Sequence, residues 1–330
     1  PRLRMIDGPM GVRSDGPATA FAGGIALAAS WNTALAERIG VEFGREARAR
    51  GAHFLLAPGV NIYRGPVAGR NFEYLGEDPF LASRIAVGFI NGVQSQGVSA
   101  TVKHFVANNA EFDRNRADSI VDERTLREIY LPAFEAAVKE ARVGAIMAGY
   151  NLTNGEHMSQ HARFNNEIAK GEWAFDGVIM SDWISTYDGL GMANGGLDIE
   201  MPDAAHFNRR TLLPALESGA VSAATLDDKV RRILRVAARF GWLDREQLDL
   251  SIPRYNVAAR QAALQGAREG TVLLKNEKSL LPIDPAQVRT VLVVGPNAHP
   301  AVVGVGVEDL DGLPGHRRDD VAGFHGVAPG

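Results

Sequence analysis

Polar side chains follow several short apolar runs of this 330-residue sequence, and one of them is a carboxylate next to a tryptophan. Asp182 comes directly after the apolar run GVIMS and precedes Trp183. Tryptophan faces stack on the apolar face of a sugar ring, and glycosidases use carboxyl groups, so this pair suits glycoside chemistry. An aspartate after a strand also commonly serves as the N-cap of the next helix. The local sequence leaves both interpretations open.

Lys103 and His104 end a second apolar run, VSATVKHF. Burying an ammonium without a partner is expensive, so a lysine at this place needs a ligand or an ion pair. Three interpretations stay open for Lys103: hydrogen bonds to sugar hydroxyls, a Schiff base of the lyase type, or a satisfied ion pair at the strand end.

Further charged residues lie in turn-like segments. Asp7 belongs to the turn signal Asp-Gly-Pro, where its carboxylate could bind two adjacent hydroxyls. Arg70 lies in GRNFEYLGEDPF, whose arginine and acids could also form surface ion pairs of little energy. His157 and His161 are four apart but lack the glutamate of a zinc-binding HExxH helix, and GMANGG lacks dinucleotide spacing. Each of these signals is weak by itself.

Composition limits the class of protein. The sequence is 45% hydrophobic with a net charge of −4, which is typical of a globular protein and not of one that binds nucleic acid or an anionic membrane surface. It has no cysteine, which excludes disulfides, thiolate metal sites and a cysteine nucleophile. We expect a small neutral or weakly charged substrate. The chain begins PRLRMIDGP without a start methionine, so we expect the native N-terminus to be missing; a cytoplasmic, periplasmic or secreted location and a homo-oligomer all stay open.

Short, nearly continuous apolar runs predict strands buried on both faces of a parallel sheet. These runs are His53–Pro58, Val98–Phe105, Val143–Tyr150, Gly177–Trp183 and Gly196–Pro202, and the first residues of the chain look like the end of another strand. Amphipathic stretches between and after them predict helices at Trp31–Arg50, Pro79–Gln96, Asp122–Arg142, Thr225–Gly241 and Val257–Gly270. Pro132 lies inside the third of these helices, where we expect a kink or a break.

Alternating strands and helices over some 240 residues predict an α/β fold. Periodicity alone allows either an open doubly wound sheet or an eightfold barrel. The apolar runs end in polar residues, and in a barrel these ends meet at one mouth, where active sites lie. We therefore favour a TIM-type (β/α)8-like barrel.

The character of the sequence changes after Gly241. We expect a catalytic barrel domain at residues 1–244, a linker at 245–256, and the start of an α/β sandwich domain at 257–330, with a strand at Thr290–Gly295. From about Val305 the sequence has neither period, and we interpret this tail as a loop, as disordered or as a non-native end.

Taken together, the segments resemble glycoside hydrolase family 3 over roughly residues 1–300, in the β-glucosidase-like branch. Eight motifs occur in the order of that family: DGPMGVR from Asp7, GRNFEYLGEDPF from Gly69, TVKHFVANNAEFDR from Thr101, VDERTLREIYLPAFE from Val121, IMAGYNLTNG from Ile146, GVIMSDW from Gly177, GGLDIEMP from Gly195 and TVLLKNEKSLLPI from Thr271. The hexosaminidase branch has a KHFPGHG-type loop, whereas this chain has KHFVANNAEFDR. Glu111 and Asp113 in this loop are interpreted as structural. The resemblance implies a barrel followed by an α/β sandwich domain.

The resemblance also assigns roles by position. Asp182 matches the nucleophile of the family. The remaining site residues match positions that bind sugar hydroxyls or line the pocket: Asp7, Arg70, Lys103, His104, Met147, Tyr150, Trp183 and, with a less defined role, Arg114. The implied activity is that of a retaining β-glycosidase, most simply a β-glucosidase that removes terminal β-D-glucosyl residues by double displacement, with no metal or organic cofactor.

Retention requires two carboxyl groups about 5 Å apart. We expect Asp182 to attack as an ionised carboxylate, kept ionised by Lys103 and Arg70. In the family the acid/base is a glutamate of the sandwich domain, which we expect to lie outside this chain, although Glu308 and Asp309 are acids in the nearest position. The alternatives are an impaired or non-catalytic carbohydrate-binding fragment without that acid/base, a β-xylosidase, and a Schiff-base lyase that uses Lys103.

Overall fold

The structure is a computed structural model, and it describes residues 2–14, 16–254, 256–292 and 294. Its centre is a five-stranded parallel sheet in the order β1-β2-β3-β5-β8. The strands are β1 (Met5–Asp7), β2 (Phe54–Leu56), β3 (Ser99–Phe105), β5 (Ala145–Ala148) and β8 (Val178–Met180). These five strands coincide with the runs predicted from the sequence, and the prediction of an α/β fold is confirmed.

The sixth predicted strand, Gly196–Pro202, is wrong as a strand. Within the described residues it contributes one parallel bridge, between Ile199 and Met180. The cause is Asp198, whose carboxylate accepts the backbone N–H of Ile179 at 2.8 Å. The Asp198 side chain thus binds the backbone N–H of Ile179 that a regular ladder would have used. The segment therefore pairs with β8 only through the bridge between Ile199 and Met180.

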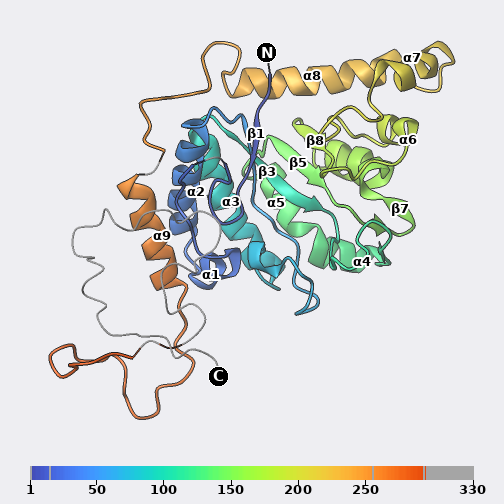
Figure 1. The fold of residues 1–330 in the computed structure, drawn as a ribbon. Coiled ribbons are helices and arrows are strands. Elements are labelled where there is room, and N and C mark those ends of the chain that lie inside the picture. Colours follow the sequence, from blue (N-terminus) through green and yellow to red (C-terminus); the bar gives the residue numbers. More distant parts are fainter. Residues whose placement is uncertain (1, 15, 255, 293, 295–330) are drawn as a thin grey trace, which may run out of the picture.

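Helices cover the sheet and connect its strands (Figure 1). The longer ones are α2 (Thr33–Arg48), α3 (Pro79–Ser95), α5 (Pro132–Lys139), α7 (Arg209–Glu217), α8 (Ala223–Arg239) and α9 (Val257–Glu269), and the shorter ones are α1 (Gly24–Ala29), α4 (Glu123–Thr125) and α6 (Gly189–Asn194). The other helical turns are η1 (Asn71–Glu73), η2 (Leu126–Tyr130), η3 (Met158–Gln160) and η4 (Arg163–Glu172). A small second sheet contains β4 (Asp118–Ser119), β6 (Leu152–Thr153) and β7 (Glu156–His157).

Side-chain caps explain where several helices begin. Asn32, Asp78 and Ser222 accept the backbone N–H three residues ahead, at the starts of α2, α3 and α8. The break predicted at Pro132 is confirmed. The helical pattern there divides into α4, the π-helical turn η2 and α5, with Pro132 in the first turn of α5, where its missing N–H costs no hydrogen bond.

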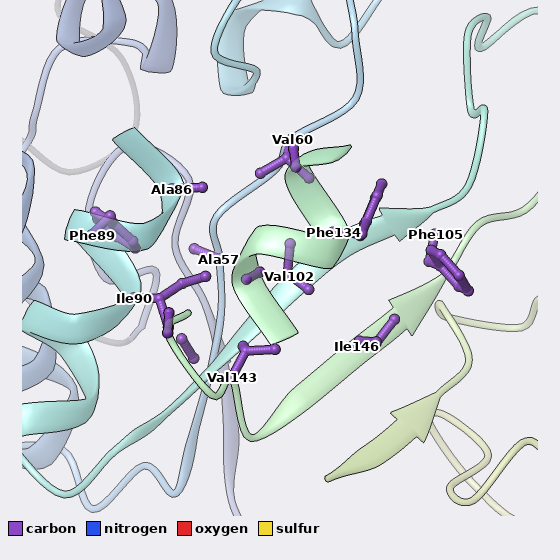
Figure 2. Close-up of a cluster of buried hydrophobic side chains, with 14 of the residues drawn as sticks. Ala57, Val60, Ala86, Phe89, Ile90, Val102, Phe105, Phe134, Val143 and Ile146 are labelled. Carbon is purple, nitrogen blue, oxygen red and sulfur yellow. The ribbon is translucent and has the colours of Figure 1, made fainter. Parts of the chain in front are cut away.

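The main core lies between the sheet and helices α3 and α5 (Figure 2). Val102 and Phe105 of β3 and Ile146 of β5 are fully buried there, with Phe134 of α5 and Ile90 of α3 opposite them. The ring centroids of Phe105 and Phe134 are 5.1 Å apart in an edge-to-face arrangement. Because β3 is buried along its whole length, the core fixes the strand end that carries Lys103 and His104.

The C-terminal part of the described chain bears on the domain prediction. Helix α9 packs against α2 and α1 and so contacts the same body as the sheet (Figure 1). Residues 290–292 and 294 of the strand predicted at Thr290–Gly295 are not in a strand. The tail from Val305 lies outside the described residues, and the boundaries at 244 and 256 stay predictions. Among the described residues no helix is long and apolar enough to cross a membrane.

Candidate active site

The parallel register brings the ends of the strands together. Asp7 ends β1 and is paired with Leu56, Lys103 is paired with Met147, and Met147 is paired with Met180, two residues before Asp182. Polar side chains from different parts of the sequence therefore lie at the same edge. A cavity of about 410 Å³ opens there, lined by Met5, Asp7, Arg13, Leu56, Arg70, Lys103, Met147, Asp182 and Trp183. Six of the predicted site residues belong to this lining: Asp7, Arg70, Lys103, Met147, Asp182 and Trp183.

Asp182 lies in the wall of the cavity with its side chain 10% exposed. Its Oδ1 accepts the backbone N–H of Trp183 at 2.7 Å. Its Oδ2 lies 3.5 Å from His104 Nε2 and 3.9 Å from Arg70 Nη1, and it accepts no hydrogen bond within the described part of the chain. Helix α6 is instead capped by Asp188, so the N-cap interpretation of Asp182 is wrong.

Burial and the neighbouring polar groups shift the pKa of Asp182 in opposite directions. Burial raises the pKa of Asp182, and the Trp183 N–H, Arg70, Lys103 and Tyr150 lower it, with a net shift upward. Arg70 and Lys103 act in the expected direction, since both lower the pKa, but removal of the carboxylate from water outweighs them.

Lys103 and Arg70 are held by a shared carboxylate that the sequence interpretation missed. Glu73, whose side chain is 1% exposed, places Oε1 2.5 Å from Arg70 Nε and Oε2 3.5 Å from Lys103 Nζ. Lys103 Nζ also donates to Asp7 Oδ1 at 3.1 Å, and Asp7 Oδ2 lies 3.8 Å from Arg13 Nη1. Lys103 Nζ is thus paired with two carboxylates, and this arrangement favours the ion-pair interpretation over a Schiff-base lysine.

His104 lies behind the cavity and is fully buried, so it does not belong to the lining. Burial, with Arg70, Lys103 and Arg114 nearby, lowers the pKa of His104 well below its ordinary value, so the imidazole is neutral. Its Nδ1 lies 3.2 Å from the Tyr74 hydroxyl and its Nε2 faces Asp182. A proton on Nε2 suits this setting, because Nε2 faces an anion while Nδ1 can accept from Tyr74.

Tyr150 and Arg114 flank the carboxylate from the segments after β5 and β3. The guanidinium carbon of Arg114 lies 3.6 Å from the ring centroid of Tyr150, and its Nη1 donates to Glu111 Oε2 at 2.6 Å. Burial and the Asp182 carboxylate raise the pKa of the Tyr150 phenol, so it stays protonated and can donate to Asp182. Glu111 contacts Arg70 and Arg114 without lining the cavity, in line with a structural role.

Sequence reasoning missed the residues that support the site from behind. Asn61 accepts the backbone N–H of His104 at 2.7 Å and donates to its carbonyl at 2.9 Å. Glu73 and Tyr74 follow Arg70 by three and four residues, and this spacing in GRNFEY was the one available signal. Glu308 and Asp309 lie outside the described residues.

Comparisons with known proteins agree with this geometry. Residues 3–236 match the glycosyl hydrolase family 3 N-terminal domain. A β-glucosidase of Rhizobium radiobacter is 44% identical over 313 residues, which cover 92% of this chain and 38% of that protein. The structure of β-glucosidase 3B from Thermotoga neapolitana in complex with glycerol aligns with a TM-score of 0.81 and 38% identity over 86% of this chain and 42% of that one. A β-glucosidase from Kluyveromyces marxianus in complex with glucose aligns with a TM-score of 0.81 and 36% identity, covering 85% of this chain and 36% of that one.

These similarities also place the sheet in a known architecture. The α/β fold is of the TIM type, although the five hydrogen-bonded strands of the described part do not close a barrel. The chain spans less than half the length of each relative named above. With a matched domain that covers residues 3–236 and a carboxylate-lined cavity at the strand ends, the chain belongs to glycosyl hydrolase family 3.

Proposed function

We propose that this chain carries the sugar-binding cavity and the nucleophile of a retaining β-glucosidase, with Asp182 as the nucleophile. The observation that supports this most directly is the position of Asp182, which lines the cavity and whose Oδ2 accepts no hydrogen bond from the described residues within ordinary hydrogen-bond geometry. A carboxylate oxygen must have a free lone pair to attack carbon. The relatives named above are β-glucosidases, and one solved neighbour contains glucose.

The proposed reaction has two steps. In the first, Asp182 Oδ2 forms a bond to the anomeric carbon while the bond from that carbon to the leaving oxygen breaks, and an acid protonates the leaving oxygen. In the second, the group that acted as acid takes a proton from water, the water oxygen bonds to the same carbon, and the bond from that carbon to the carboxylate breaks. We assign the acid/base to no described residue, in keeping with the prediction that it belongs to the sandwich domain.

The groups around the cavity suit the binding of a neutral sugar. Asp7, Lys103 and Arg70 offer one acceptor and two donors at the lining, and Trp183, 38% exposed, offers an aromatic face. Asp7 and Lys103 already form an ion pair, which can exchange hydrogen bonds with a pair of adjacent hydroxyls without creating an unpaired charge. Met147 and Leu56 supply apolar surface beside them.

The proposal is tested by trapping the covalent intermediate. We expect 2,4-dinitrophenyl 2-deoxy-2-fluoro-β-D-glucoside to add one fluoroglucosyl unit to the protein, which peptide mass mapping should locate on Asp182. Dinitrophenolate leaves without protonation, so the assay depends on the nucleophile and not on the acid/base.

The variant Asp182→Asn should show no adduct. The matched control is Asp188→Asn, an exposed position six residues later, where asparagine caps α6 as well as aspartate does, and this variant should be labelled like the wild type. An adduct on another residue, or none in the wild type under conditions where it is folded, refutes the assignment.

A further inference from the structure

Glu73 is a buried carboxylate that touches two of the three cations that line the cavity, Arg70 and Lys103, without lining it. It lies at the end of the single turn η1, and its side chain is 1% exposed. Burying a charge at this depth is unfavourable unless it is paired. Its partners, Arg70 Nε at 2.5 Å and Lys103 Nζ at 3.5 Å, are separated by 33 positions in the sequence. The local turn brings Glu73 to Arg70, and the fold brings Lys103 to both.

The same two cations face the carboxylates that are expected to act on the sugar. Arg70 Nη1 lies 3.9 Å from Asp182 Oδ2, too far for a hydrogen bond, and Lys103 Nζ lies 3.1 Å from Asp7 Oδ1. A guanidinium free of Glu73 would be attracted to Asp182, because a paired geometry of about 2.8 Å is the favoured one for such ions. Glu73 holds Arg70 by Nε and so keeps its other end at a distance from Asp182.

A free Oδ2 is what the proposed reaction requires. A cation bonded directly to Asp182 Oδ2 would occupy the lone pair that attacks carbon and would stabilise the ground-state carboxylate. The remaining neighbours of Asp182 are neutral or already paired: His104 is neutral at 3.5 Å, Tyr150 is a protonated phenol, Lys103 is paired with Asp7 and Glu73, and the Trp183 N–H binds Oδ1. Arg70 is therefore the cation best placed to bind Oδ2. Its main restraint is Glu73 at 2.5 Å, and Glu111 lies 3.9 Å away.

We propose that Glu73 is a positioning residue that holds Arg70 and Lys103 in place for the sugar and keeps Arg70 off the nucleophile Asp182. This inference rests on the proposed function of Asp182. Glu73 touches neither substrate nor reacting atoms, and it acts only through its two partners. A purely structural carboxylate would stabilise the fold without affecting the ionisation of Asp182.

The test is the pH dependence of inactivation by the same dinitrophenyl fluoroglucoside, measured for the wild type and Glu73→Gln. Removal of the negative charge releases Arg70 toward Asp182 and should lower the pKa of that carboxyl. The acid limb of the profile, where the inactivation rate falls as Asp182 is protonated, should therefore move to lower pH. The rate at the plateau should fall about tenfold or more, because Oδ2 is then engaged and Lys103 is displaced. The variant Glu73→Asp keeps the charge, so its acid limb should stay near that of the wild type while its plateau rate falls.

A matched control is Glu46→Gln. Glu46 is also fully buried and lies near an arginine, Arg50, but it bonds to Thr19 away from the cavity. This variant should keep the wild-type pH profile of inactivation. An unchanged acid limb and plateau in Glu73→Gln, with the wild type labelled on Asp182, overturns the inference and leaves the proposed function standing. If Glu73→Gln does not fold, the test passes to Glu73→Asp. A plateau inactivation rate of Glu73→Asp equal to that of the wild type also overturns the inference.

Discussion

Tyr74 contacts His104, and we expect the hydrogen bond between them to govern which imidazole nitrogen carries the proton. The Tyr74 hydroxyl lies 3.2 Å from His104 Nδ1, and both residues are buried. The variant Tyr74→Phe removes this donor and leaves the ring otherwise unchanged. A buried acceptor without a partner costs about 1–3 kcal/mol, so Nδ1 should take the proton and donate to Asn61 Oδ1, which lies 3.4 Å away.

The change of tautomer should also change the pKa of Asp182. Nε2 would then present a lone pair to Asp182 Oδ2 at 3.5 Å in place of an N–H, and the carboxylate form would lose a favourable contact. A neutral hydrogen bond contributes about 0.5–1.5 kcal/mol, and this 3.5 Å contact, which is no hydrogen bond, should contribute less. Since about 1.4 kcal/mol corresponds to one pH unit, we expect the pKa of the acid limb of fluoroglucoside inactivation to rise by less than about one unit.

The assay combines this pH profile with nitrogen-15 NMR of the imidazole, which distinguishes a protonated nitrogen from an unprotonated one. The wild type should carry the proton on Nε2 and Tyr74→Phe on Nδ1. The control is Tyr130→Phe, because Tyr130 is also buried and its hydroxyl bonds to Asn109 rather than to His104. A wild-type His104 that is already protonated on Nδ1, or an acid limb that moves downward in Tyr74→Phe, would refute this reasoning.

Two further predictions concern stability. Burial raises the pKa of Asp182, so the folded protein keeps this proton at pH values where the unfolded chain releases it. The free energy of unfolding should therefore fall as the pH rises from the ordinary aspartate pKa of about 3.9 through the raised pKa of the folded protein. In thermal unfolding, Asp182→Asn should therefore be more stable than the wild type at neutral pH, and the difference should vanish at about pH 3; a difference independent of pH contradicts the buried charge. Phe105→Ala should cost about 3–5 kcal/mol in urea unfolding, because the ring is fully buried and lies 5.1 Å from Phe134, and a loss below about 1 kcal/mol would contradict the packing in Figure 2.

The order and type of the main elements could be predicted from the sequence. Short runs of apolar residues must be buried on both faces, which fixes β2, β3, β5 and β8, and the amphipathic stretches fix α2, α3 and α8. The polar residues that end these runs must lie at one edge of a parallel sheet. Asp7, Lys103 and Asp182 therefore lie together because of a pattern that is local in the sequence.

The predictions for Gly196–Pro202 and for the acids of GRNFEYLGEDPF were incomplete, because tertiary contacts decide both. The run Gly196–Pro202 has the composition of a strand, but the side chain of Asp198 competes for the backbone donor of Ile179, and no period in the sequence reveals such a competition. The acids of GRNFEYLGEDPF looked like surface charges, although Glu73 is buried. Burial of a single side chain in a short turn depends on what packs over it.

The sequence by itself thus determined which strand ends bring polar side chains to the cavity and which carboxylate lies among them, because hydrophobic periodicity is a property of neighbouring residues. Only the tertiary structure decided how that carboxylate is charged and restrained. The pKa of Asp182 and the neutral state of His104 depend on burial and on distances of 3.5 to 3.9 Å between segments far apart in the chain. Electrostatic and desolvation energies change steeply over such distances, and the fold alone sets them.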